Sequence, residues 1–262
     1  MLISGQQSVI AMPPRRTRRV LHALALAIGL ALAGGALTDA RARADDLAQF
    51  NTAIEDVAAH NRVALGYLRT ENNDLALVEL DGMKTAWSAF AEKFSGNRPA
   101  PFRDNKLYVT MLVDVPTRIV TAMIMVNFGR PDIARSSLQA IREELAAVRK
   151  ESGVAVFADC VLDANAAMDA VARDHDAPID WNDTAAADIG AKADAYGAAV
   201  RRCDAAAPAA LHDNPEFRRL VDGVAASLAS VPKAVAAHDR DLLYRVINEL
   251  RSFDSLLAFR YG

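Results

Sequence analysis

Apolar residues recur along most of the chain at the spacing of amphipathic helices. Strict alternation of apolar and polar residues, which indicates β-strands, does not occur over any long segment. One stripe consists of Leu47, Phe50, Ile54, Val57, Asn61, Leu65 and Leu68, and the next consists of Leu80, Met83, Trp87, Phe90 and Phe94. This pattern predicts an all-α protein.

Polar turns and helix breakers mark where these helices end. The segments 70–73 and 95–101 separate the first three helices, and Asp74 is well placed to begin the second. The third helix is expected over about 107–128, with a bend at Pro116, because proline removes a backbone hydrogen bond. A fourth helix begins near Pro131 and ends near Gly153.

After Gly153 the pattern starts again with a period of 107 to 109 residues. Phe50 and Ile54 fall on Phe157 and Val161, and Trp87 falls on Tyr196. The loop pair Asp104-Asn105 falls on Asp213-Asn214, and the segment from Asp132 to Ile141-Arg142 falls on that from Asp241 to Leu250-Arg251. We interpret the chain as a duplication, although alanine-rich helices also resemble one another by chance.

The repeated pattern predicts two tandem up-and-down four-helix bundle units, residues 45–153 and 154–262, with helices of about 17 to 23 residues. An α-solenoid is the alternative, because Leu65-Gly66-Tyr67 and the turn that follows are similar to the helix-turn-helix of tetratricopeptide repeats. The period of about 34 residues that such repeats require is absent.

The N-terminal segment has the three regions of a secretory signal peptide. Four arginines between positions 15 and 19 precede an apolar run over 20–37, and Ala42-Arg43-Ala44 follows as a small-residue cleavage site. We therefore predict that residues 1–44 are a signal peptide and that the protein is periplasmic or secreted. A retained membrane anchor is the alternative, since the run is long enough to span a bilayer.

The net charge of the chain limits the classes of molecule that it is expected to bind. The chain has 262 residues and a net charge of −3; without residues 1–44, 24 basic residues remain against 32 acidic ones, which gives −8. An acidic chain without a Lys/Arg-rich stretch has no electrostatic support for binding nucleic acid or an anionic membrane surface. We expect an envelope protein or a small ligand as the partner.

The two cysteines are placed to form a disulfide. Cys160 lies near the start of the fifth expected helix and Cys203 near the end of the sixth, so an antiparallel hairpin with its turn at 176–183 brings them level. Disulfides persist in exported proteins, whereas no neighbouring His or Cys offers the further ligands of a metal site. The sequence therefore predicts a structural bridge rather than two buried free thiols.

The order of elements and the final helix resemble the cytochrome c′ family, whose last helix carries Cys-x-x-Cys-His followed by an aromatic-Arg pair. With Phe259-Arg260 as the anchor, Ser252 and Ser255 stand at the positions of the haem-attaching cysteines, and Leu256 stands at the axial histidine. The resemblance implies a four-helix bundle. Because the residues that attach haem are replaced, we do not expect covalently bound haem. Non-covalent haem has only His60 and Met168 as candidate ligands, and both also suit ordinary packing.

Other chemistry-bearing patterns are missing from the sequence. It has no Glu-x-x-His, His-Glu-x-x-His, Walker A or Gly-x-Ser-x-Gly motif. Met123 and Met125 point about 200° apart on a helix, and Asp174-His175-Asp176 is expected in a solvated loop, so neither suggests a metal site. We expect neither an enzyme nor a resident cofactor or metal.

The function predicted from the sequence is a binding or interaction module of the periplasm. The alternatives are an electron-transfer protein of the cytochrome c′ type with non-covalent haem and a solenoid-like scaffold for an envelope complex. The aromatic C-terminus, with Phe253, Phe259 and Tyr261, is expected to dock on its own bundle or on a partner. Pairing of the two units within one chain predicts a monomer, and a homodimer is the alternative.

Overall fold

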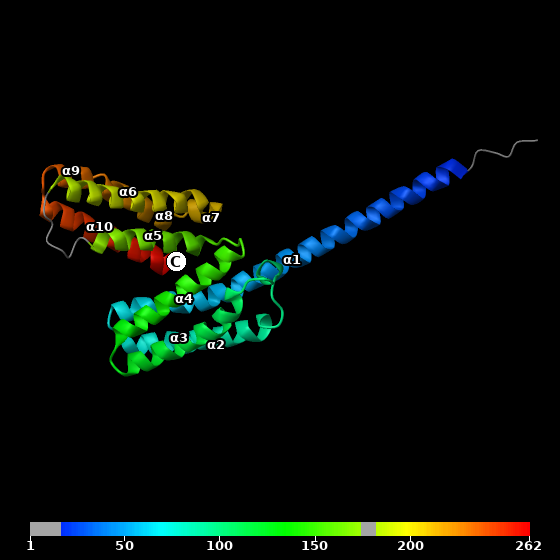
Figure 1. The fold of residues 1–262 in the computed structure, drawn as a ribbon, viewed down its shortest axis with the longest axis horizontal. Coiled ribbons are helices and arrows are strands. Elements are labelled where there is room, and N and C mark those ends of the chain that lie inside the picture. The colour runs from blue at the N-terminus through cyan, green and yellow to red at the C-terminus, as the bar shows by residue number, and fades with distance from the viewer. Residues whose placement is uncertain (1–16, 174–181) are drawn as a thin grey trace, which may run out of the picture. The chain divides into compact units, whose positions relative to one another are not determined.

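The computed structural model describes residues 17–173 and 182–262, with side chains from residue 43 onward except that of Asp183. These residues are α-helical, and the described part of the chain contains no β-strand, which confirms the all-α prediction (Figure 1). The chain divides after Ala48, and residues 49–262 form one compact unit. The division at 153/154 into two tandem bundles therefore stays a prediction, as does removal of residues 1–44.

The elements follow one another with short connections. The long helices are α1 (Thr17–Arg69), α2 (Asn73–Phe94), α3 (Leu107–Asn127), α4 (Pro131–Glu151), α5 (Phe157–Arg173), α6 (Asp183–Ala206), α8 (Pro215–Leu228) and α10 (Arg240–Tyr261). The short ones are the 3₁₀ turn η1 (Ala100–Phe102), α7 (Ala209–His212) and α9 (Val231–Ala236). Most helix ends lie within a residue or two of the positions predicted from the sequence.

Two predicted helices differ from those observed. The first does not begin near Leu47 but continues without a break from Thr17, because the segment between carries no proline and is rich in alanine and leucine. The helix expected to match α3 in the second half is divided into α8 and α9. Pro232 lies at the start of α9 and has no N–H to donate to the carbonyl of Leu228, whereas α3 continues through Pro116.

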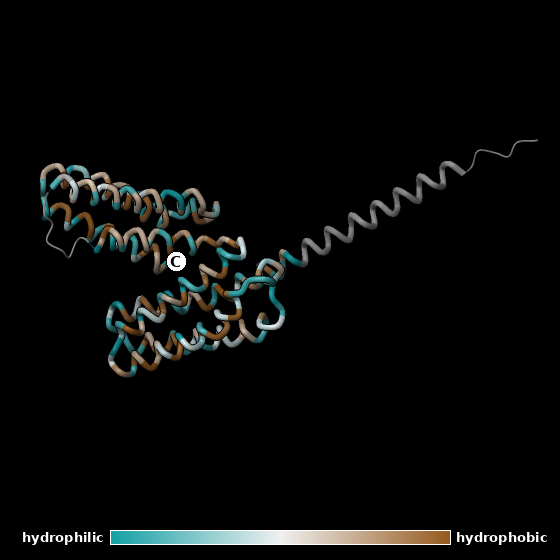
Figure 2. Tube along the Cα trace, viewed as in Figure 1, coloured by the Kyte–Doolittle hydropathy of each residue, from teal (hydrophilic) through white to brown (hydrophobic). Residues whose placement is uncertain are grey.

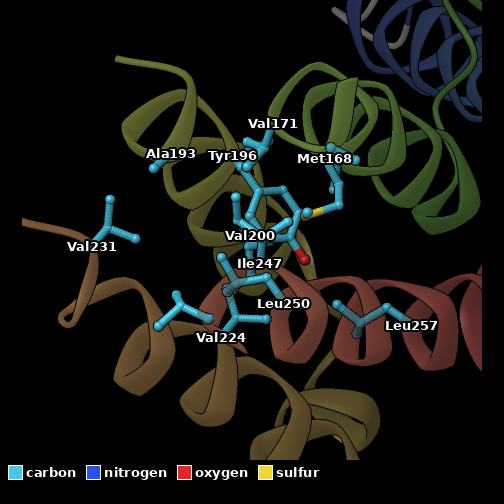
Figure 3. Close-up of a cluster of buried hydrophobic side chains, with 14 of the residues drawn as sticks. Met168, Val171, Ala193, Tyr196, Val200, Val224, Val231, Ile247, Leu250 and Leu257 are labelled. Carbon is cyan, nitrogen blue, oxygen red and sulfur yellow. The ribbon is translucent and has the colours of Figure 1, made fainter. Parts of the chain in front are cut away.

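Burial of the predicted apolar stripes holds the helices together. Hydrophobic and hydrophilic residues are interspersed along the coloured helices of Figure 2, as expected for amphipathic helices. In the first half, the Phe50 ring lies 4.4 Å from that of Phe102 and 5.3 Å from that of Phe90, centroid to centroid. In the second half, Tyr196 lies fully buried beside Met168, Val200 and Ile247 (Figure 3). Close packing of these residues accounts for the cores of both halves.

The same helix-ending turn occurs four times in the described chain, with a left-handed residue at Glu71, Gly129, Gly153 and His238. Gly129 and His238 both adopt the left-handed conformation, with φ of 69° and 50°. The N–H of Arg130 donates to the carbonyl of Met125, and that of Asp239 donates to Ala234, at 2.8 and 2.9 Å. The turns at Gly129 and His238 lie 109 residues apart, but the same turn also ends α1 and α4, so it is a general helix ending of this chain.

The aromatic C-terminus docks on its own chain. The Phe259 ring lies against Gly66 of α1, where an added Cβ would approach it to 3.1 Å, and Phe253 lies against Gly223 of α8. Tyr261 packs edge-on against Phe217, with ring centroids 5.4 Å apart. Of the two alternatives for this segment, the one in which it packs on its own chain is confirmed.

Cys160 of α5 and Cys203 of α6 form the predicted disulfide, with Cα atoms 5.4 Å apart. The bridge joins the open end of the α5–α6 hairpin and closes a sequence separation of 43 residues. The turn of this hairpin lies at 174–181, outside the described residues. The bridge restricts the unfolded chain over this whole loop.

Replacing both cysteines, Cys160→Ala with Cys203→Ala, is expected to lower the free energy of unfolding by about 2 to 4 kcal/mol, because the unfolded chain regains loop entropy. Urea denaturation followed by circular dichroism measures this difference. The control is the variant with and without dithiothreitol, which should unfold identically. Equal midpoints for the wild type and the variant under oxidising conditions would show that the bridge does not stabilise the fold.

Candidate functional site

The two residues predicted as haem-ligand candidates lie in different surroundings. The Nδ1 atom of His60 lies 2.8 Å from Oε2 of Glu79, and its ring packs on Gly82, so His60 contacts α2. Met168 is 2% exposed within the core of the second half (Figure 3). A hydrogen bond to Glu79 accounts for His60 and core packing accounts for Met168, and the structure does not bring the two side chains together. Haem ligation by either remains a prediction.

Metal-ligating groups do not gather in the described part of the chain. No cluster of three or more His, Cys, Asp or Glu side chains occurs among the residues whose side chains are described. Asp174-His175-Asp176, the acidic loop noted in the sequence, lies outside these residues.

Arginines gather around one cavity of about 500 Å³ between α1, α4, α5 and α10. The charged side chains that line it are Arg62 and Arg69 of α1, Arg135 and Arg142 of α4, Asp169 of α5, and Arg251 and Asp254 of α10. Five arginines therefore meet two aspartates on a chain that is acidic as a whole. We call this space the arginine cavity.

Arg142 lies at the centre of the contacts that build the arginine cavity. Its Nη1 donates to Oε1 of Gln139 at 3.0 Å, and its Nη2 donates to Oδ1 of Asn165 at 2.9 Å. Its Nε is buried and has no hydrogen-bond acceptor in the described structure. Burial lowers the pKa of Arg142, and Asp254 opposes this effect. Because a guanidinium stays charged at any physiological pH, Arg142 keeps a donor without an acceptor.

Asp254 is a buried carboxyl group at the same cavity. Its Oδ1 accepts a hydrogen bond of 3.0 Å from Nδ2 of Asn165, which links Arg142 of α4 through α5 to α10. Burial raises the pKa of Asp254 from 3.8 to about 6; the hydrogen bond from Asn165 lowers it, and the neighbouring charge of Asp169 raises it. Burial and the nearby Asp254 also raise the pKa of Tyr196. The cavity therefore changes charge near pH 6.

Arg62 of α1 forms a hydrogen bond with the C-terminal end of the chain, directly after α10. Its Nη1 donates to the carbonyl oxygen of Gly262 at 2.8 Å, and its Nη2 donates to Oε1 of Glu55 at 2.6 Å. Gly262 in turn lies close to Arg142, since an added Cβ would come within 2.6 Å of Nη2. These contacts fix two of the five arginines in place.

The other three arginines surround the cavity at the surface. Arg69, Arg135 and Arg251 are exposed, and none of them forms an ion pair with any described residue within 4 Å. Arg62 has Glu55 as a counter-charge, so the uncompensated positive charge lies mainly on these three side chains. An anion approaching the cavity therefore meets an attractive field.

A second cavity of about 500 Å³ lies on the other side of Arg142. Its two other arginines already have carboxylate partners, Arg149 with Asp159 and Arg260 with Glu216. Its lining includes Ile54 and Leu145, and it also contains Asn61, whose buried Oδ1 has no donor in the described structure. Paired charges make this cavity less suited to an anion than the arginine cavity.

The arrangement is suited to binding anionic groups. Guanidinium groups bind carboxylates and phosphates through paired, charge-assisted hydrogen bonds. The polar groups at the arginine cavity are arginines, amides, a serine and two aspartates. Nothing in this set is a nucleophile hydrogen-bonded to a general base.

Sequence reasoning missed the arginine cavity altogether. Its arginines come from three helices, so no local stretch of the chain is rich in basic residues. Two signals were present: Arg62 and Arg69, like Arg135 and Arg142, are seven residues apart and so share a helix face. Arg142 and Arg251 are also equivalent in the duplicated register. The missing information was which helices of the two halves face each other.

No family model, curated protein or solved structure matches the chain. The resemblance to the cytochrome c′ family, inferred from the order of helices and the final helix, therefore stays a prediction.

Asp254→Asn tests the buried carboxyl group. Because folding raises the pKa of Asp254, the wild type loses stability as the pH rises from about 4 to about 6, where this group ionises. The amide keeps the acceptor for Asn165 without the charge, so the variant should be more stable at pH 7.5, by about 2 kcal/mol, and equal to the wild type at pH 4.

Urea unfolding at the two pH values measures this difference, and Asp104→Asn at an exposed loop position serves as the matched control. A variant that is less stable than the wild type by the same amount at both pH values would contradict the assignment.

Proposed function

We propose that the protein is an exported, non-catalytic binding module whose arginine cavity binds a small anion bearing carboxylate or phosphate groups. The observation that carries this proposal is the gathering of five arginines from three helices on one cavity of an acidic chain. Long side chains of like charge repel one another, and an anion between them removes that repulsion.

The size and polarity of the cavity suit such a ligand. A volume of about 500 Å³ is within the range of small-molecule sites. Asn165, Gln139 and Ser255 add neutral hydrogen-bonding groups that can orient the ligand. Arg142, held by Asn165 and Gln139, offers a preorganised guanidinium in the wall of the cavity. Preorganised groups lose little entropy on binding.

Asp254 adds a dependence on pH. Below about pH 6 its carboxyl group is neutral, which removes one negative charge from the cavity. Anion affinity should therefore increase as the pH falls through this value, provided that the anion keeps its own charge.

Binding is tested by isothermal titration calorimetry with citrate and with inorganic phosphate at low ionic strength. The double variant Arg135→Gln/Arg251→Gln should lower the affinity by about tenfold, since each arginine contributes a screened, charge-assisted contact. Arg219→Gln, at an exposed position of α8, is the matched control and should bind as the wild type does. Equal affinities for the double variant and this control, or no binding of either anion to the wild type, would contradict the proposal.

Identifying the N-terminal residue of the exported protein tests the proposed location. Removal of the signal peptide after Ala44 predicts a protein that is recovered from the periplasmic fraction and begins at Asp45. Intact mass measurement and N-terminal sequencing identify this end. A full-length chain in the membrane fraction would favour the retained anchor instead.

A further inference from the structure

The outward face of α3 is apolar, which is unusual for a helix on the surface of an acidic protein. The buried face of this helix contributes Tyr108, Val115 and Ile119 to the core. On the opposite face, an exposed stripe follows Val109, Val113, Thr117, Val120, Ile124 and Phe128. Val113 is 61% and Phe128 is 76% exposed. We call this row the α3 stripe.

The polar side chains along this face are already satisfied within the helix. The hydroxyl of Thr117 donates to the carbonyl of Val113, and that of Thr121 donates to Thr117, both at 2.8 Å. The amide of Asn127 donates to the carbonyl of Met123, also at 2.8 Å. Burying this face therefore leaves few polar groups without a partner.

The second half of the chain provides an internal comparison. In the 109-residue register, Val109, Val113 and Ile124 correspond to Arg218, Asp222 and Lys233. The inward positions keep apolar residues in both halves, for example Tyr108 and Phe217. The outward face of α8 and α9 thus carries the charges expected of a solvated surface, whereas that of α3 does not.

The order of residues in the α3 stripe is symmetric. Its members are separated by four, four, three, four and four residues, so the spacing reads the same in both directions about a midpoint between residues 118 and 119. Two α3 helices packed antiparallel about a twofold axis would place Val113 opposite Ile124 of the partner subunit. The same axis would place Val109 opposite Phe128 of the partner subunit. The small residues Thr117 and Val120 would then lie at the centre, where the helices approach most closely.

We propose that the α3 stripe is a homodimer interface, in which α3 packs antiparallel against the same helix of a second copy. The stripe runs about 29 Å at the rise of an α-helix, which gives five turns of self-complementary apolar contact. A twofold interface requires one patch to match itself, and a palindromic stripe meets this requirement.

A lipid bilayer is the competing occupant. Among the residues whose side chains are described, α3 is the one helix with the length and hydropathy of a membrane span. However, its other face is buried against the protein, and the helix carries Asp114 and Arg118, the latter paired with Glu144. A second copy would cover only the outward face of α3, and this is the face that the described part of the chain leaves exposed.

Sedimentation equilibrium of the exported protein tests the proposal, with an expected mass of twice the chain. The variant Val113→Asp/Ile124→Asp places carboxylates opposite each other across the proposed interface and should sediment as a monomer. Its helical circular dichroism and disulfide should remain as in the wild type. Val78→Asp on α2 is the matched control, because Val78 is 66% exposed and lies outside the stripe; it should remain dimeric.

The antiparallel register is tested by cysteine cross-linking. The chain's two native cysteines are bonded to each other, so new cysteines have no native thiol to pair with. A mixture of the Val113→Cys and Ile124→Cys chains should form a disulfide-linked dimer under mild oxidation. Either variant alone should not, since two copies of position 113 would lie about 16 Å apart along the helix axis.

Three results would overturn the proposal. They are a monomeric wild type at about 100 µM, a Val113→Asp/Ile124→Asp variant that remains dimeric, and a monomer that sediments with vesicles of phosphatidylethanolamine and phosphatidylglycerol. The last result would assign the stripe to a membrane. Cross-linking of Val113→Cys alone would exclude the antiparallel arrangement.

Discussion

Arg142 is half-buried, and the acceptors that hold its guanidinium group join helices at the centre of the molecule. The side chain takes one acceptor from its own helix, Gln139, and another from α5, Asn165, which in turn binds Asp254 of α10. Removing any of these partners would leave a charge or a polar group buried without compensation, which is a far larger penalty than the loss of one contact. Helices from both halves of the chain are therefore joined by polar groups, and the arginine cavity lies where these long side chains meet.

Much of the fold could be predicted from the sequence because helices and hairpins depend on local spacing. The stripe from Leu80 to Phe94 is buried as predicted, and the hairpin register together with the expected export of the chain predicted the pairing of Cys160 with Cys203. The prediction failed at Pro232, which divides the expected helix into α8 and α9, whereas α3 continues through Pro116. The candidate site could not be predicted, since its arginines share a cavity only through contacts between helices distant in sequence.

In the register of the predicted duplication, equivalent positions of the two halves differ both at the surface and in the interior. Both end their third helical segment with the same left-handed turn, at Gly129 and at His238. At the first helix of each half, Asn61 is buried with one unpaired oxygen, whereas the equivalent Met168 lies wholly in apolar surroundings. Each position in one half has a counterpart in the other half. A difference between the two residues shows where one half departs from the shared helical pattern.

The continuous α1 helix has a further consequence for the exported protein. A signal peptidase that cuts after Ala44 would cut within this helix and would leave Asp45 and Asp46 as its first residues. A newly exposed helix N-terminus has four N–H groups without acceptors and a partial positive charge, and two carboxylates at that end are the residues best suited to compensate both. Maturation would thus produce a helix that begins with its own stabilising charges, just before Phe50 enters the core.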